Sequence, residues 1–157
     1  MKRTRFYLTI LFAAATLISA SAQNSSGEKI FAEHADECLT AMEQAALKME
    51  VKGVAVLAFI PGDTSLSWIS KMKVVGAMTN ESANYLAVAY SKAGEMAETL
   101  KNSGSGVREP KLGEFGWQGG IIKKVEGGYI LAAFSGATGE QDVEIATVGL
   151  KQLISVY

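Results

Sequence analysis

The stretch GVAVLAFIPG, residues 53 to 62, decides which fold this chain adopts. It holds seven apolar residues in a row, Val54 to Ile60, between Gly53 and the turn-forming pair Pro61-Gly62. A strand with one face in water would alternate apolar and polar residues, so an unbroken apolar run of this length predicts a strand covered on both faces. Helices are therefore expected on either side of the sheet that contains it.

Three segments have the apolar spacing of a helix packed on one face. The first runs from about Glu28 to Val51 and is expected to stop at Gly53. The second is expected to start at a cap formed by Thr79 or Asn80 and to run to about Leu100. The third covers residues 139–156. Small residues on the second helix, such as alanines, would let it sit close to the sheet.

Further strands are predicted at residues 66–75, 120–125 and 129–135. The last two are joined by Glu126-Gly127-Gly128, whose glycines permit the positive φ angles of a tight hairpin turn. The expected element order is α-β-β-α-β-β-α. Because hairpins make the sheet antiparallel, we predict an α+β fold, a three-layer α-β-α sandwich with a central antiparallel sheet.

The first 22 residues have the three parts of a secretory signal peptide. Lys2, Arg3 and Arg5 precede an apolar stretch that runs to about Ala20, and small residues follow at Ala20-Ser21-Ala22. We expect cleavage after Ala22 and export to the periplasm or the cell exterior. Residues 23–27 would then form a flexible lead-in, and residues 28–157 a single domain.

The charge balance and the cysteine count exclude some classes of partner and bond. The leader holds three of the 15 Lys and Arg residues and none of the 16 Asp and Glu residues, so the expected mature chain has 12 basic against 16 acidic side chains. Such a balance argues against nucleic acid or an anionic membrane as partner. Cys38 is the single cysteine, so the domain must be stable without an internal disulfide, and we expect Cys38 to be buried.

A glycine-rich loop, FSGATGEQD at residues 134–142, raises the question of a phosphate site. Thr138 and Gln141 have the spacing of a capping box, which predicts the start of a helix. Glu140 and Asp142 fall in the same first turn, where their carboxylates would repel a phosphate. The spacing matches neither the P-loop nor the dinucleotide fingerprint, and the loop contains no Lys or Arg. We therefore interpret it as a capped helix start.

Residues 119–150 contain several short motifs in a defined order. A double glycine precedes a hairpin, the second strand ends in Ser-Gly, and the next helix starts with Gln-Asp and continues with small residues. The residues are Gly119-Gly120-Ile121-Ile122, Gly127, Ala132 to Asp142, Ala146 and Gly149-Leu150, with Ala89, Lys92 and Ala93 in the second helix. This pattern resembles the haem-degrading, GlcG and HbpS-like family.

The resemblance implies a profilin-like domain that forms homo-oligomers and, in some members, binds haem or a related tetrapyrrole. This chain departs from the family pattern at three places. Ile121 stands where a proline usually follows the double glycine. Polar residues of the family are replaced by Ile60-Pro61-Gly62 after the first strand and by Lys71 to Ala77 before the second helix.

Three residues are candidates for contact with such a ligand: His34, Phe115 and Trp117. His34 is the single histidine and stands four residues before Cys38, so the two lie on one helix face. Such a pair could ligate a soft metal or present an axial ligand to haem iron, and the alternative is a partly exposed histidine beside a buried thiol. Two ligands do not make a metal cage, so no metal site is predicted.

Phe115 and Trp117 belong to a long irregular segment, residues 101–120, of the kind that is often functional or mobile. Their rings could cover a flat apolar ligand, dock against another subunit, or close over the edge of the sheet. These three interpretations remain open from the sequence.

No complete catalytic constellation appears in the sequence, since one histidine and no nucleophile elbow exclude Ser/His/Asp catalysis. We therefore expect a non-catalytic exported domain that binds a small ligand, haem or a related tetrapyrrole, and that oligomerises. The alternative is an oligomeric structural or assembly module without a small-molecule ligand. An enzyme acting on a small metabolite is a third hypothesis, which lacks a base and nucleophile pair.

Overall fold

The computed structural model describes residues 26–62 and 67–157, so the expected signal peptide lies outside the described residues. A helix over residues 26–48, here called the N-terminal helix, precedes all the strands. It is followed by β1 (Gly53–Pro61), β2 (Ile69–Val75), α2 (Tyr85–Thr99), β3 (Gly120–Val125), β4 (Gly128–Ser135) and α3 (Gly139–Ile154). The predicted α+β class and the order α-β-β-α-β-β-α are confirmed.

The four strands form one antiparallel sheet with the order β2-β1-β4-β3. β1 lies in the interior of the sheet, where Val56 is paired with Met72 of β2 on one side and with Ala133 of β4 on the other. β2 and β3 form the two edges. Because β1 pairs on both sides, its backbone N–H and C=O groups are taken up by the sheet, as a fully buried segment requires.

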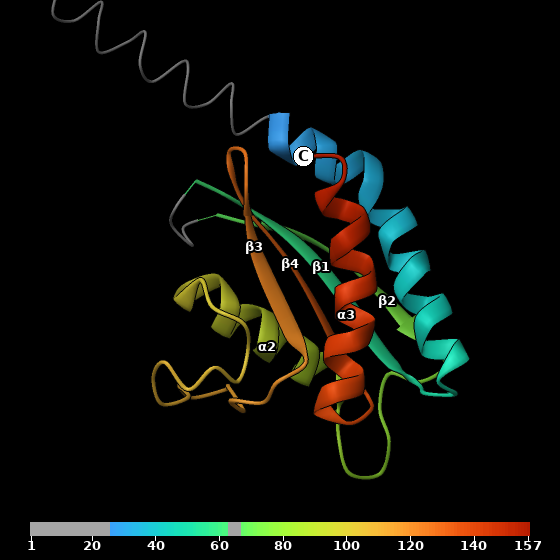
Figure 1. Cartoon of the computed structure of the whole chain (residues 1–157). Coiled ribbons are helices and arrows are strands. Elements are labelled where there is room, and N and C mark those ends of the chain that lie inside the picture. Colours follow the sequence, from blue (N-terminus) through green and yellow to red (C-terminus); the bar gives the residue numbers. More distant parts are fainter. Residues whose placement is uncertain (1–25, 63–66) are drawn as a thin grey trace, which may run out of the picture.

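Side chains of β1 alternate between two separate hydrophobic cores. Ala55, Leu57 and Phe59 pack with the N-terminal helix and α3, whereas Val54, Val56, Ala58 and Ile60 pack with α2. All seven are completely buried. Figure 1 shows the resulting three layers, with α2 on one side of the sheet and the other two helices on the opposite side. The strand covered on both faces is therefore confirmed.

The start of the second helix differs from the prediction. Asn84 is its N-cap, with a side-chain oxygen that accepts from the N–H of Ala87 at 3.0 Å. Asn80 instead uses its side-chain oxygen to accept two backbone N–H groups of the preceding turn, and Thr79 pairs with Asn84 in an isolated bridge. Residues 79–84 thus form a closed turn, and the helix begins only after it.

The N-terminal helix also differs from the prediction at both ends. It includes Ser26 and Gly27, which we expected in a flexible lead-in. Gly27 is buried against the ring of Phe59, and its carbonyl accepts from the hydroxyl of Tyr157 at 2.7 Å, which explains why this residue is ordered. The helix ends at residue 48 rather than near Val51, because Glu50 takes a left-handed conformation with φ of 57°.

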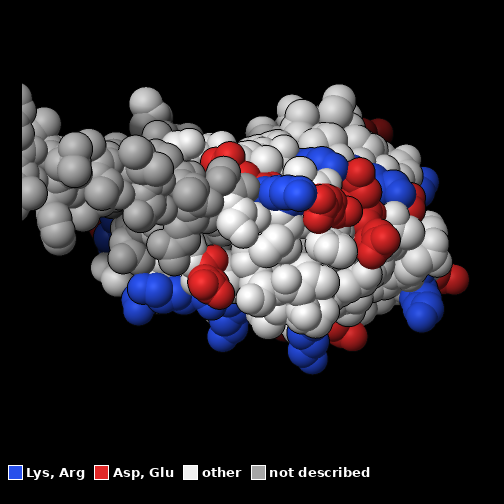
Figure 2. Space-filling view, turned by 90° about the horizontal axis from the view of Figure 1, so that it is seen from above, with Lys and Arg blue, Asp and Glu red and all other residues white. Residues whose placement is uncertain are grey.

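Charged side chains of both signs are interspersed on the face shown in Figure 2. Two ion pairs join β2 to the N-terminal helix, Lys71 with Asp36 at 3.0 Å and Lys73 with Glu43 at 2.5 Å. Within residues 26–62 and 67–157, no helix combines the length and the apolar character needed to span a bilayer.

Two glycines in helix interiors give a matched test of this packing. A Cβ on Gly149 of α3 would lie 2.5 Å from Cγ of Met42, whereas a Cβ on Gly94 of α2 would meet nothing within 4 Å. We expect Gly149→Ala to lower the free energy of unfolding by about 1–3 kcal/mol through overpacking. Gly94→Ala should raise it by up to about 1 kcal/mol through helix propensity. Urea denaturation of the two variants checks this, and equal effects would contradict the close packing of α3 on the N-terminal helix.

Candidate functional site

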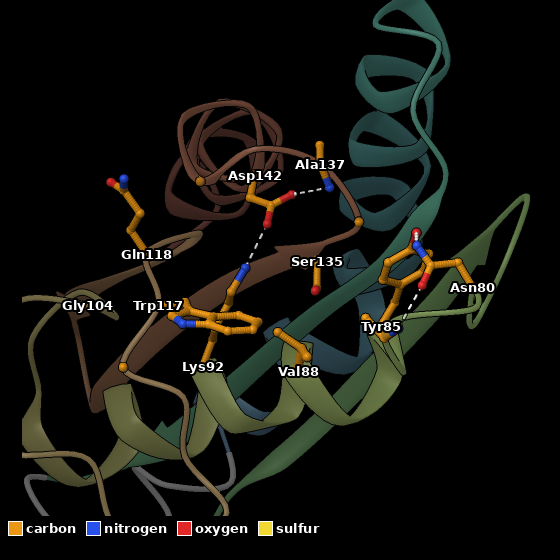
Figure 3. Close-up of a pocket in the computed structure, with 14 residues that line it drawn as sticks. Asn80, Tyr85, Val88, Lys92, Gly104, Trp117, Gln118, Ser135, Ala137 and Asp142 are labelled. Atoms are coloured by element: carbon orange, nitrogen blue, oxygen red, sulfur yellow. Dashed lines mark hydrogen bonds and ion pairs between the residues drawn. The ribbon is translucent and has the colours of Figure 1, made fainter.

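An open cleft of about 710 Å³ lies where α2, the segment over residues 101–119 and the β4–α3 turn meet (Figure 3). Helix α2 contributes Tyr85, Val88 and Lys92 to its walls. The long segment contributes Gly104 and Gly116 to Gln118, and the β4–α3 region contributes Ser135 to Ala137, Gly139 and Asp142. Elements that are far apart in the sequence thus form one site at the end of β4.

A buried ion pair forms part of this cleft. The Lys92 ammonium donates to Oδ2 of Asp142 at 2.7 Å and to the carbonyl of Phe134 at 2.8 Å. The other carboxylate oxygen of Asp142 accepts from the N–H of Ala137 at 3.1 Å. Both side chains are 3% exposed. The pair joins α2 and α3, which cover opposite faces of the sheet.

Local sequence explains how the two charged groups reach each other. Thr138 caps α3 in the predicted capping box with Gln141, and this start places Asp142 within the first turns of the helix. Gly119 leaves room for the lysine, because a Cβ there would lie 2.3 Å from Nζ of Lys92. Its φ of 129° also disfavours any residue with a side chain.

Burial shifts both groups toward their neutral forms. It raises the pKa of Asp142 to about 6, and the attraction of Lys92 and the N–H of Ala137 oppose that rise. Burial also lowers the pKa of Lys92, against the attraction of Asp142. Near pH 7 the short hydrogen bonds and the carbonyl of Phe134 favour the charged pair. A desolvated pair that faces a cleft is a candidate functional site.

Ser135 is a polar residue of the cleft without a partner. It is 5% exposed, and within the described residues its hydroxyl makes no hydrogen bond. Figure 3 shows its oxygen pointing into the cleft, toward Val88. Because the hydroxyl opens onto the cleft and has no protein partner among the described residues, it is available to a ligand or to water.

The aromatic wall of the cleft is held by a well-anchored segment. Arg108 donates to both carboxylate oxygens of Glu114, at 2.6 and 2.8 Å, and also pairs with Glu98. These bonds lower the pKa of Glu114 to about 2. The N–H of Phe115 donates to Oγ of Ser91 on α2 at 3.1 Å. The long segment therefore has a defined shape where it approaches the cleft.

The predicted contact residues fall into two groups. Trp117 lines the cleft, and the ring of Phe115 packs against it with the centroids 4.8 Å apart. His34 is half-buried on the N-terminal helix, on the opposite side of the sheet. The structure thus brings Phe115 and Trp117 together and leaves His34 away from them.

Cys38 is completely buried, as predicted, and burial raises the pKa of its thiol to about 11. The thiolate that a soft metal requires is therefore disfavoured at Cys38. In the part of the chain that the structure describes, no group of three or more His, Cys, Asp or Glu side chains is arranged to hold a metal ion.

Sequence reasoning missed the pairing of Lys92 with Asp142. The glycine-rich loop contains no basic residue, and the cation that pairs with Asp142 comes from α2, 50 residues earlier in the chain. The available signal was the position of Lys92 between Ala89 and Ala93, which belong to the apolar core on that side of the sheet. A charged residue on a buried face requires a partner of opposite charge.

Comparison with known protein families gives no matching family, and comparison with curated proteins gives no matching protein. The resemblance to the haem-degrading, GlcG and HbpS-like family therefore stays a prediction.

Removing one member of the pair should cost more than removing both. We expect Lys92→Met to lower the free energy of unfolding by about 3–5 kcal/mol, because it leaves a buried carboxylate without a counter-ion. Adding Asp142→Asn should recover more than half of that loss, since the amide keeps an acceptor for Ala137. Chemical denaturation at pH 7.5 measures both. A double variant as unstable as the single one would contradict a coupled pair.

The raised pKa of Asp142 predicts a particular dependence of stability on pH. Its folded pKa of about 6 exceeds the ordinary 3.8, so the folded state binds more protons between these values. As the pH falls from 7 to 4.5, wild-type stability should therefore rise by about 1–2 kcal/mol relative to the Lys92→Met, Asp142→Asn variant. Urea titrations at both pH values measure the difference. Parallel changes in the two proteins would contradict the shift.

Proposed function

We propose that the chain is an exported, non-catalytic domain that binds a small ligand in the cleft around Lys92 and Asp142. The observation that carries this proposal is the hydroxyl of Ser135, a largely buried residue, which has no partner among the described residues and is directed into the cleft. Beside it lies an ion pair with an unused donor, and Trp117 forms an aromatic wall. A few convergent polar groups beside an aromatic surface are typical of ligand sites.

The arrangement of the polar groups favours binding over catalysis. Lys92 is held by Asp142 and the carbonyl of Phe134, so its amine is not free to act as a base or nucleophile. Ser135 has no hydrogen-bonded base among the described residues, and the single histidine is on the other side of the sheet. The groups that line the cleft are therefore better suited to orienting a ligand than to transferring a proton.

Haem or a related tetrapyrrole is the ligand class supported by the family resemblance. The indole of Trp117, against which Phe115 packs, offers a flat apolar surface at the cleft. His34 would not reach a ligand held there, because the sheet lies between them. A tetrapyrrole in the cleft would thus be held by the aromatic wall, whereas one bound through His34 would occupy a second, separate surface.

Titration of the purified protein with hemin, followed in the Soret region, tests the ligand class and its place. For binding in the cleft, Trp117→Ala should weaken affinity at least about tenfold through loss of stacking area, and His34→Ala should leave it unchanged. The opposite result would move the site to the N-terminal helix. The absence of any saturable shift would exclude haem.

An assembly module without a small ligand is the second candidate function. Four large apolar residues of the long segment are exposed: Val107, Leu112, Phe115 and Trp117. Exposed apolar side chains concentrated on one segment favour contact with another protein surface, such as a second copy. Light scattering at micromolar concentration tests this candidate, and a monomer would exclude it.

A further inference from the structure

The cleft presents several hydrogen-bond donors that the protein does not use. The Lys92 ammonium has three N–H groups and gives two of them to Asp142 and Phe134, which leaves one. The Ser135 hydroxyl is free among the described residues. The hydroxyl of Tyr85 accepts from Nδ2 of Asn80 at 2.6 Å, so its own hydrogen remains available. A ligand that offers an acceptor oxygen would satisfy these groups.

The charges of the cleft decide which kind of acceptor fits. Lys92 and Asp142 are the charged residues among those that line it, and they neutralise each other. Glu140 adds a further carboxylate at the rim, where it accepts from Gln118 at 3.3 Å. A ligand carboxylate would therefore enter beside Asp142 without a counter-ion of its own. Like charges at such short range in a desolvated site are unfavourable.

An uncharged carbonyl avoids this repulsion and still accepts the same hydrogen bonds. The rest of the ligand meets apolar surface, since Val88 and Trp117 lie on the walls beside Lys92 (Figure 3). Phe115, which packs against the indole, stiffens that wall. A flat group would bury the most area there, because aromatic faces prefer planar partners.

Building on the proposed ligand-binding function, we propose that the cleft selects an uncharged planar molecule with a carbonyl or carboxamide group. Its oxygen accepts from Lys92 and Ser135, and its flat part lies against Trp117. A carboxylate at the same position is disfavoured. A haem in the cleft would accordingly have to keep both of its propionates away from Asp142.

Nicotinamide and nicotinate form a matched pair of probes, since they differ in carboxamide against carboxylate on the same ring. Binding to the whole protein is followed at pH 7.5 by the NMR signals of the Ser135 and Ala137 amides and the Trp117 indole. We expect saturable shifts with nicotinamide and a dissociation constant at least about tenfold higher for nicotinate. Ser135→Ala should weaken nicotinamide binding about five- to tenfold.

Ser135→Ala is expected to fold, because the hydroxyl it removes has no protein partner among the described residues. Ser70→Ala is the matched control, since Ser70 lies on β2, away from the cleft, and loses only a 3.2 Å bond to Tyr90. It should bind nicotinamide like the wild type. Together the two variants separate loss of the cleft hydroxyl from loss of a serine elsewhere.

Three results would overturn this inference: equal or tighter binding of nicotinate, unchanged nicotinamide affinity in Ser135→Ala, or no shift of the cleft signals by either probe. None of them removes the proposed function. The proposed ligand-binding function fails only when hemin and a library of chemically varied fragments also leave the NMR signals of Ser135, Ala137 and Trp117 unchanged.

Discussion

The burial of β1 on both faces is the constraint from which the rest of the structure follows. Its backbone must be hydrogen-bonded by neighbours on both sides, and its alternating side chains must be covered by helices in two layers. Polar side chains that could contact a ligand are therefore found at the ends of the strands. At one such end, where β4 leads into α3, helices from the two opposite layers come close enough for Lys92 to meet Asp142.

The Lys92–Asp142 ion pair is better explained by the position it gives to a charged group in the cleft than by a contribution to the stability of the fold. The free-energy cost of removing two charges from water is only partly offset by their mutual attraction. A well-packed apolar pair would therefore stabilise the fold at least as well. The pair instead fixes one cation at a known point of the cleft wall, next to a serine with spare hydrogen-bonding capacity. Gly119, which allows the lysine to lie there, belongs to the same arrangement.

Local patterns in the sequence predicted most of the fold. The apolar run of β1, the glycine hairpin between β3 and β4, and the capping box of Thr138 and Gln141 each specify a structure within a few residues, and all three are present. The candidate site was harder to predict from the sequence. Lys92 and Asp142 are 50 residues apart, and only the packing of both helices around β4 brings them together. The same kind of information was missing for the cap: Asn80 and Asn84 are chemically equivalent, but the structure uses Asn80 in the preceding turn and Asn84 as the N-cap. Long-range information was also missing for His34, because the side of the sheet on which it lies depends on the path of the whole chain.

The two outer strands of the sheet have a consequence for self-association. Each carries a pair of lysines, Lys71 and Lys73 on β2, and Lys123 and Lys124 on β3. Lysines on an open edge strand discourage continuous strand addition, although Lys71 and Lys73 already form ion pairs with Asp36 and Glu43 of the N-terminal helix. Strand-to-strand joining of two copies is thus disfavoured at these edges, and helix and loop surfaces are better suited to contact between copies.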